Sequence, residues 1–183
     1  MFEKPKPLLE FFNIKLYSYL IKMREENLFN SYNGIKLKPV QVVEQIISFM
    51  REDPNRHYKV IIGTDSELYE KTQADFVTAV VVRRIGNGGR YFWRREELGG
   101  FHTLRDRILK EVLLSLDIAK SIIVLFRGTD APLFDFEIHV DIGSVGETKK
   151  MIQELVGIIR GNNFEVRTKP ESYAASSIAD RCI

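Results

Sequence analysis

Two aspartates stand where predicted strands end, a position from which a carboxylate can bind a metal ion. Asp65 follows the apolar run 60–63 in YKVIIGTDSE, and Asp141 follows a later strand in FEIHVDIG. Side chains alternate across a strand, so Asp65 shares a face with Gly63, which leaves open space beside it. His139 and Asp141 likewise share one face. The two carboxylates come together if their strands are neighbours in the sheet.

Two carboxylates held close together repel each other, and burial raises the cost of keeping both charged. A divalent cation relieves this repulsion, and hard Mg²⁺ or Mn²⁺ prefers oxygen ligands. A pair of such ions can activate water and stabilise the leaving oxygen when a phosphodiester bond is cleaved. The spacing leaves a second interpretation open, because GTDS is equally typical of a strand that ends in an aspartate-stabilised turn.

The elements that position these residues alternate between strand and helix patterns. Period-two alternation predicts strands over 58–65, 75–84, 90–98, 135–143 and 164–169. The turn IGNGG joins the second and third of these as a hairpin. Apolar residues at helical spacing predict helices over 102–120, 147–161 and the C-terminal PESYAASSIADRCI, while 121–127 fits either more helix or a short strand. This order predicts an α/β fold with a mixed five-stranded sheet flanked by helices.

Two further helices are predicted ahead of this domain, over 8–30 and from Pro39 to about Arg51. Pro54 marks the predicted boundary between an N-terminal helical extension, 1–54, and the main domain, 55–183. The apolar stripes of the extension can pack on the main sheet or on a second subunit, so a homodimer is compatible with the sequence.

The composition is that of a globular protein and excludes several kinds of site. A chain of 183 residues that is 44% hydrophobic can bury one good core, and its net charge of +2 permits nucleic-acid binding without arguing for it. The single cysteine, Cys182, excludes an internal disulfide and a cysteine-rich zinc site. No stretch is long and uncharged enough to span a bilayer, and no cleavage site follows the apolar start. We therefore expect a cytoplasmic protein that does not contact a membrane.

The segments GTDSE, FEIHVDIG and KPESYAASSIADR, in this order of elements, resemble the YkuK-type family of bacterial ribonuclease H-like proteins. The resemblance runs from about residue 56 to the C-terminus and is strongest over 137–181. It implies a ribonuclease H-like fold, whose active members are metal-dependent nucleases, resolvases and transposases. A fold does not by itself fix an activity.

The resemblance also implies four acidic positions. Asp65 matches the acid of the first strand, Asp141 that of the fourth strand, and Glu111 the glutamate of the intervening helix. Asp180 in ASSIAD is similar to the closing acid of junction resolvases. Those enzymes often carry a second carboxylate one turn earlier, where this chain has Ser177.

Other acids compete for two of these roles. Asp106 and Asp117 lie on the same predicted helix as Glu111, and Glu111 itself could be a solvated residue paired with Arg107 one turn earlier. Glu171 is the reserve candidate for the last position, although acids in a first helical turn often only complement the helix dipole.

Basic and aromatic residues alternate along the predicted hairpin, which suits phosphate contact and base stacking. The candidates for nucleic-acid binding are Arg83, Arg84, Arg90, Trp93, Arg94 and Arg95. The alternative is a strand pair with a buried aromatic face and a solvated arginine face. Elsewhere, His139 could serve the site or be a hydrogen-bonded strand histidine, and Lys169 could reach a phosphate.

These features predict a metal-dependent nuclease that hydrolyses phosphodiester bonds in structured or hybrid nucleic acid, DNA or RNA. Its catalytic and metal-binding residues would be Asp65, Glu111, Asp141 and Asp180, with a two-ion Mg²⁺ or Mn²⁺ site. The alternative is a non-catalytic nucleic-acid-binding module on the same scaffold, which would show salt-sensitive binding without turnover.

Overall fold

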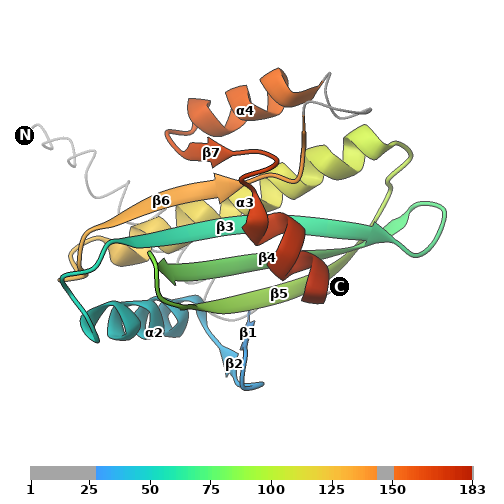
Figure 1. The fold of residues 1–183 in the computed structure, drawn as a ribbon. Helices are drawn as coiled ribbons and strands as arrows, with labels where there is room; N and C mark the ends of the chain where they lie inside the picture. The colour runs from blue at the N-terminus through green and yellow to red at the C-terminus, as the bar shows by residue number, and fades with distance from the viewer. Residues whose placement is uncertain (1–27, 144–150, 183) are drawn as a thin grey trace, which may run out of the picture.

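The computed structural model describes residues 28–143 and 151–182. Its strands are β1 (Phe29–Ser31), β2 (Lys36–Leu37), β3 (Tyr58–Leu68), β4 (Gln73–Arg84), β5 (Gly89–Gly99), β6 (Phe134–His139) and β7 (Glu165–Arg167). Its helices are α2 (Pro39–Arg51), α3 (Leu104–Phe126) and α4 (Ile152–Gly161) (Figure 1). A π-helical turn, Ala174–Ala179, and a 3-10 turn, Asp180–Cys182, close the described chain, and we call them together the C-terminal helix.

The strands form one mixed sheet in the order β2-β1-β5-β4-β3-β6-β7. β3, β4 and β5 make an antiparallel meander, whereas β6 runs parallel to β3 and β7 parallel to β6. The prediction of a mixed sheet is confirmed, but the prediction of five strands is wrong because the sheet has seven. β1 and β2 are three and two residues long, too short to show an alternating pattern, and β1 joins the sheet by pairing Asn30 with Trp93 of β5.

The helices differ from the prediction mainly at their ends. The helix predicted over 8–30 lies outside the described residues up to 27, and Phe29 and Asn30 belong to β1. α3 continues to Phe126, so the strand interpretation of 121–127 is wrong. Ser121 Oγ donates a hydrogen bond to the Asp117 carbonyl, 2.7 Å away, as a helical residue can do toward the preceding turn. No helix within the described ranges is long and apolar enough to cross a membrane.

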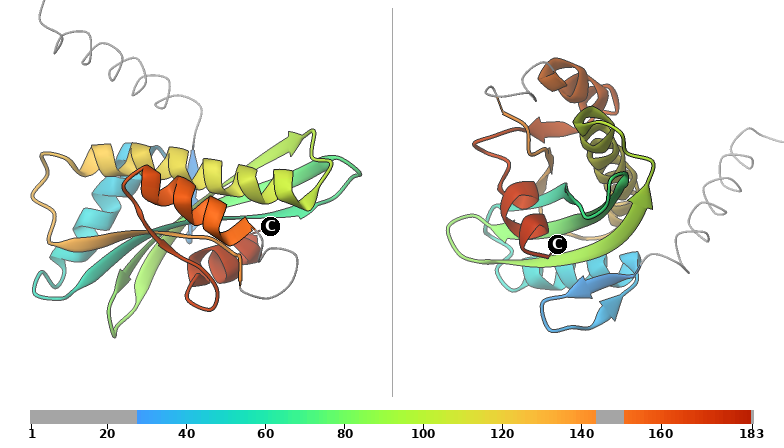
Figure 2. Two further views of the ribbon diagram at one scale, coloured as in Figure 1. Left: turned by 90° about the horizontal axis from the view of Figure 1, so that it is seen from above. Right: turned by 90° about the vertical axis from the view of Figure 1, so that its right-hand side faces the viewer.

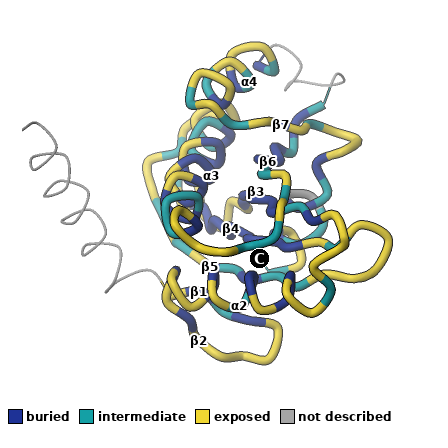
Figure 3. Tube along the Cα trace, turned by 90° about the vertical axis from the view of Figure 1, so that its left-hand side faces the viewer, coloured by how far each residue is buried: buried dark blue, intermediate teal, exposed yellow. Residues whose placement is uncertain are grey.

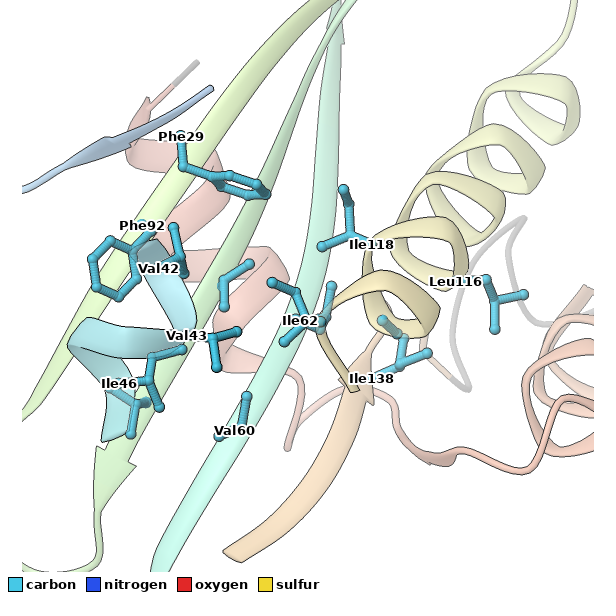
Figure 4. Packing of buried hydrophobic residues seen from close by; sticks show 14 of the residues in the cluster. Phe29, Val42, Val43, Ile46, Val60, Ile62, Phe92, Leu116, Ile118 and Ile138 are labelled. Carbon is cyan, nitrogen blue, oxygen red and sulfur yellow. The ribbon is translucent and has the colours of Figure 1, made fainter. Parts of the chain in front are cut away.

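The two faces of the sheet are covered by different helices. α2 and α3 pack on one face, which carries residues such as Val60, Ile62 and Phe92 (Figure 4). The other face carries Ile61 and Ala79 and packs against the C-terminal helix, which lies in front of the strands in Figure 1 and is seen from two further sides in Figure 2. The buried parts of the trace gather in the central strands and the inner side of α3 (Figure 3).

The described part of the extension contributes to the same sheet and the same core as the residues that follow it. β1 and β2 form one edge of the sheet, and Val42, Val43 and Ile46 of α2 lie in the cluster that contains Ile62. The domain boundary at residue 54 stays a prediction.

Removing the Phe29 side chain tests whether β1 belongs to the core. Phe29 is fully buried, so Phe29→Ala should lower the free energy of unfolding by about 3–5 kcal/mol, measured by urea denaturation. Tyr32→Ala, at a position that is 63% exposed in the same segment, should change it by less than about 0.5 kcal/mol. Equal losses in the two variants would contradict this placement of β1.

Candidate functional site

Asp65 and Asp141 lie at the carboxyl ends of two neighbouring parallel strands. The pairing of β3 with β6 ends where Gly63 meets His139, and each aspartate lies two residues beyond that pair. Asp141 lies in a tight turn just past β6, because the Ile142 N–H donates to the Val140 carbonyl at 2.9 Å. Beyond this point β3 pairs only with β4 in the described chain. No described strand pairs with the edge of β3 beside Asp65, and we call this edge open. The carboxyl ends of strands are where α/β sheets bind ligands.

The surroundings of Asp65 make its charge costly. Its pKa is raised from 3.8 to about 6, chiefly by burial, and the nearby carboxylates of Asp141 and Asp180 raise it further. The backbone N–H of Ser66 donates a hydrogen bond to the carboxylate and, with Arg107, opposes this shift. The carboxylates of Asp141, beyond the end of β6, and Asp180, in the C-terminal helix, are thus close enough to Asp65 to act on its charge.

Two hydroxyl contacts fix α3 on β3 and bring in Glu111. Ser115 Oγ lies 2.8 Å from Thr64 Oγ1, and Ser66 Oγ donates a 2.5 Å hydrogen bond to Glu111 Oε1. The four-residue step from Glu111 to Ser115, about 6 Å along the helix, matches two residues of strand, about 6.6 Å, so both pairs form at once. The position of Glu111 along the sheet therefore follows from the packing of α3.

Glu111 is only 5% exposed, so the alternative of a solvated helix glutamate is wrong. Burial raises its pKa from 4.5 to about 8, with further increases from Asp65 and Asp141. The hydrogen bond from Ser66 and the charge of Arg107 act in the opposite direction. With a pKa of about 8, the Glu111 carboxyl group is mostly protonated at pH 7 when no cation is bound beside it.

The competing acids have other partners or surroundings. Asp106 accepts a hydrogen bond from the backbone N–H of Thr103 and belongs to the capping box that begins α3. Asp117 is exposed. Glu171 is also exposed and lies 3.5 Å from the guanidinium of Arg167. None of these three contributes to the pKa shifts of Asp65 or Glu111 described above.

The ion pair between Lys169 and Asp141 opposes the binding of a metal ion at this edge. Its Nζ lies 2.9 Å from Asp141 Oδ2, and its backbone N–H donates to the Ile142 carbonyl at 2.8 Å, which sets it beside the end of β6. Asp141 Oδ1 is buried and has no hydrogen-bond partner among the described residues. Carboxylate oxygens are suitable donors for Mg²⁺, yet residues 28–143 and 151–182 contain no group of three or more acidic, histidine or cysteine side chains arranged to hold a metal. A two-ion site stays a prediction.

Glu137 was not among the predicted site residues, although FEIHVD places it two residues before His139 on the same face. Its carboxylate is 5% exposed and accepts a 2.7 Å hydrogen bond from Lys59 Nζ, with Arg167 Nη2 at 3.4 Å. Burial alone would raise its pKa, but hydrogen bonds from Lys59 and His139 lower it below the usual range. Glu137 is therefore a buried anion held by surrounding donors.

His139 connects this anion to the C-terminal helix. Its Nε2 lies 3.3 Å from Glu137 Oε2, and its Nδ1 accepts the backbone N–H of Ala174 at 3.4 Å. The Tyr173 ring meets the imidazole edge-on at 5.0 Å. Burial lowers the pKa of His139 despite the carboxylate. The imidazole is a hydrogen-bonded strand histidine that anchors the helix carrying Asp180.

Most arginines of the hairpin pair with carboxylates. Arg84 and Arg90 both contact Glu52 at the end of α2, at 3.3 and 2.6 Å. The other pairs are Arg94 with Glu96 and Arg95 with Asp75.

Arg83 has no carboxylate partner among the described residues and lies over the Tyr173 ring, 5.3 Å from its centroid. Trp93 packs with Tyr91 on the face that the C-terminal helix covers. Nucleic-acid binding by the predicted residues, Arg83, Arg84, Arg90, Trp93, Arg94 and Arg95, stays a prediction.

Two comparisons with known proteins give a match. The profile of the ribonuclease H-like family matches residues 41–183. The uncharacterized protein YkuK of Bacillus subtilis (strain 168) is 33% identical over 171 residues, covering 87% of this chain and 98% of that protein. No solved structure gives a significant match to the chain.

The raised pKa of Glu111 predicts a pH-dependent stability. Because its pKa is about 8 in the folded chain against 4.5 ordinarily, the folded state holds this proton more tightly and loses stability as pH rises across that window. Glu111→Gln removes the charge and keeps an acceptor for Ser66. Its free energy of unfolding should lie within about 1 kcal/mol of the wild-type value near pH 5 and exceed it by about 4–5 kcal/mol at pH 8.5, because each pKa unit corresponds to about 1.4 kcal/mol.

Urea unfolding followed by Trp93 fluorescence at the two pH values measures this difference. Glu67→Gln, an exposed acid two residues beyond Asp65, is the control and should leave stability unchanged at both. A Glu111→Gln difference that is the same at pH 5 and pH 8.5 would show that Glu111 is not a buried acid.

Proposed function

Because the chain belongs to the YkuK-type family of ribonuclease H-like proteins, we propose that it is a metal-dependent nuclease that hydrolyses phosphodiester bonds in structured or hybrid nucleic acid. Family membership supports a nucleic-acid-related function. The observation that carries the catalytic proposal is geometric: Asp65 and Asp141 follow the paired ends of β3 and β6, and the buried Glu111 is held at the same end of β3 by the hydrogen bond from Ser66.

The four carboxylates would hold Mg²⁺ or Mn²⁺ at the open edge of β3. Such ions supply an activated water and stabilise the leaving oxygen. The chain contributes the orientation of the acids: Ser66 holds Glu111, and the packing of the C-terminal helix holds Asp180. Arg107, which contacts the Ser66 carbonyl and, at 3.2 Å, its hydroxyl, balances part of the negative charge.

Lys169 has to leave Asp141 before that carboxylate can accept another cation. Its side chain is 52% exposed, so the ammonium can move into solvent or toward a phosphate without a large desolvation cost. An ammonium that shifts from a carboxylate to the substrate backbone would couple nucleic-acid binding to opening of the acidic site.

A second candidate is a nucleic-acid-binding module without turnover. The Lys169–Asp141 ion pair favours it, because Lys169 already neutralises one of the four acids. This candidate predicts salt-sensitive binding and no cleavage with either metal.

Cleavage of end-labelled DNA, RNA, hybrid and four-way-junction substrates with Mg²⁺ or Mn²⁺ separates the two candidates. We expect wild type to cleave at least one substrate, and Asp65→Asn or Asp141→Asn to lower kcat/KM by about 100-fold or more, because each removes a charged ligand. Glu67→Gln makes a matched charge change two residues from Asp65 and should retain activity. Asp65→Asn with wild-type activity would reject the assignment, and binding without cleavage by wild type would favour the second candidate.

A further inference from the structure

A hollow of about 430 Å³ opens between the β4–β5 turn and the C-terminal helix. Its lining combines the turn residues 86–89 with the side chains of Arg83, Arg90, Tyr91, Tyr173 and Ile178. A volume of this order is in the range of small-molecule sites and is large enough for a nucleobase. The lining is mixed, because it contains two tyrosines, two arginines and apolar side chains.

Arg83 is the cation available to a ligand in this hollow. Arg90, the other arginine of the lining, is held by Glu52 at 2.6 Å, whereas Arg83 has no carboxylate partner in the described parts of the chain. The Tyr173 ring supports the Arg83 guanidinium from one side, with its centroid 5.3 Å away. A guanidinium oriented by an aromatic ring and free of acids is suited to binding phosphate.

The aromatic and backbone surfaces of the hollow suit a planar base. Tyr91 is half-buried and packs against Trp93 at 5.9 Å and 35°, which fixes its ring while leaving part of it accessible. Gly86 and Gly88 have φ values of 85° and 74°, and no atom lies within 4 Å of the position a Cβ would take. The turn therefore presents bare backbone to the opening.

The hollow and the acidic edge lie on the same face of the sheet. Val77 of β4 pairs with Asp65, and Arg83 follows six residues later, so alternation brings it to the same face. Six strand residues span about 20 Å, which corresponds to about six nucleotides at 3.4 Å each. One nucleic-acid strand can therefore reach both places.

We propose that this hollow binds an unpaired nucleotide, with Arg83 on its phosphate and Tyr91 against its base, about six nucleotides from the acidic edge. The inference rests on the proposed function and names its substrate class, which is a nucleic acid that carries a single-stranded segment. A base inside a duplex is stacked on both faces and cannot present one to Tyr91, so a blunt duplex offers this contact only at its two end pairs.

Fluorescence anisotropy of the full-length protein with labelled 12-nucleotide single strands and a blunt 12-base-pair duplex tests the inference without divalent ions. The single strand, as DNA or as RNA, should bind at least fivefold more tightly than the duplex. Arg83→Ala should weaken single-strand binding at least fivefold and reduce the slope of log K against log salt by about one, and Arg83→Lys should restore the slope. Tyr91→Leu, which keeps an apolar side chain against Trp93, should weaken the single strand and leave the duplex unchanged.

Arg127→Ala is the matched control, because Arg127 is an exposed arginine at the end of α3. Equal effects of Arg83→Ala and Arg127→Ala, equal affinity for single strand and duplex, or no binding of any probe would overturn the inference. The two proposals fail separately. Cleavage by wild type with unchanged affinity in Arg83→Ala removes only this inference, and the predicted binding pattern without cleavage removes only the nuclease.

Discussion

The burial of the Glu111 carboxyl group between α3 and β3 is the constraint on which the candidate site depends. A buried acid is costly when charged, and here a hydrogen bond from Ser66 and a retained proton offset that cost. The contact of Ser115 with Thr64 one turn away lets the helix lie close to the strand. The two contacts are equally far apart along α3 and along β3. A shift of α3 along β3 would therefore break both, and Glu111 stays beside Asp65.

A second buried carboxylate, that of Glu137, holds the other half of the site in place. Its donors include Lys59 and His139, and His139 in turn accepts the N–H that begins the C-terminal helix. Asp180 is therefore positioned by a chain of contacts that starts in the middle of the sheet. Two basic side chains offset part of the negative charge. Arg107 acts on Asp65, and Lys169 forms an ion pair with Asp141.

The order of strands and helices from β3 to α4 could be predicted from alternation and helical spacing, because each of these elements has six residues or more. The same patterns brought Asp65 and Asp141 to one edge, whereas Glu111 and Asp180 came from resemblance, since spacing within a helix does not show what lies across from it. β1 and β2 were missed because so few residues carry no period. The division of the hairpin arginines into paired ones and Arg83 depends on partners from α2, β4 and β5 itself, which become known only with the register.

We propose that the four acids form one cation site at the open edge of β3, from which Lys169 is displaced. A crystal structure grown with Mn²⁺, with anomalous scattering recorded for the metal, would locate such a cation. We expect anomalous density between Asp65 and Asp141, with Lys169 Nζ moved away from Asp141. A crystal without manganese at this edge, in which the Lys169–Asp141 ion pair is intact, would rule out the proposed site.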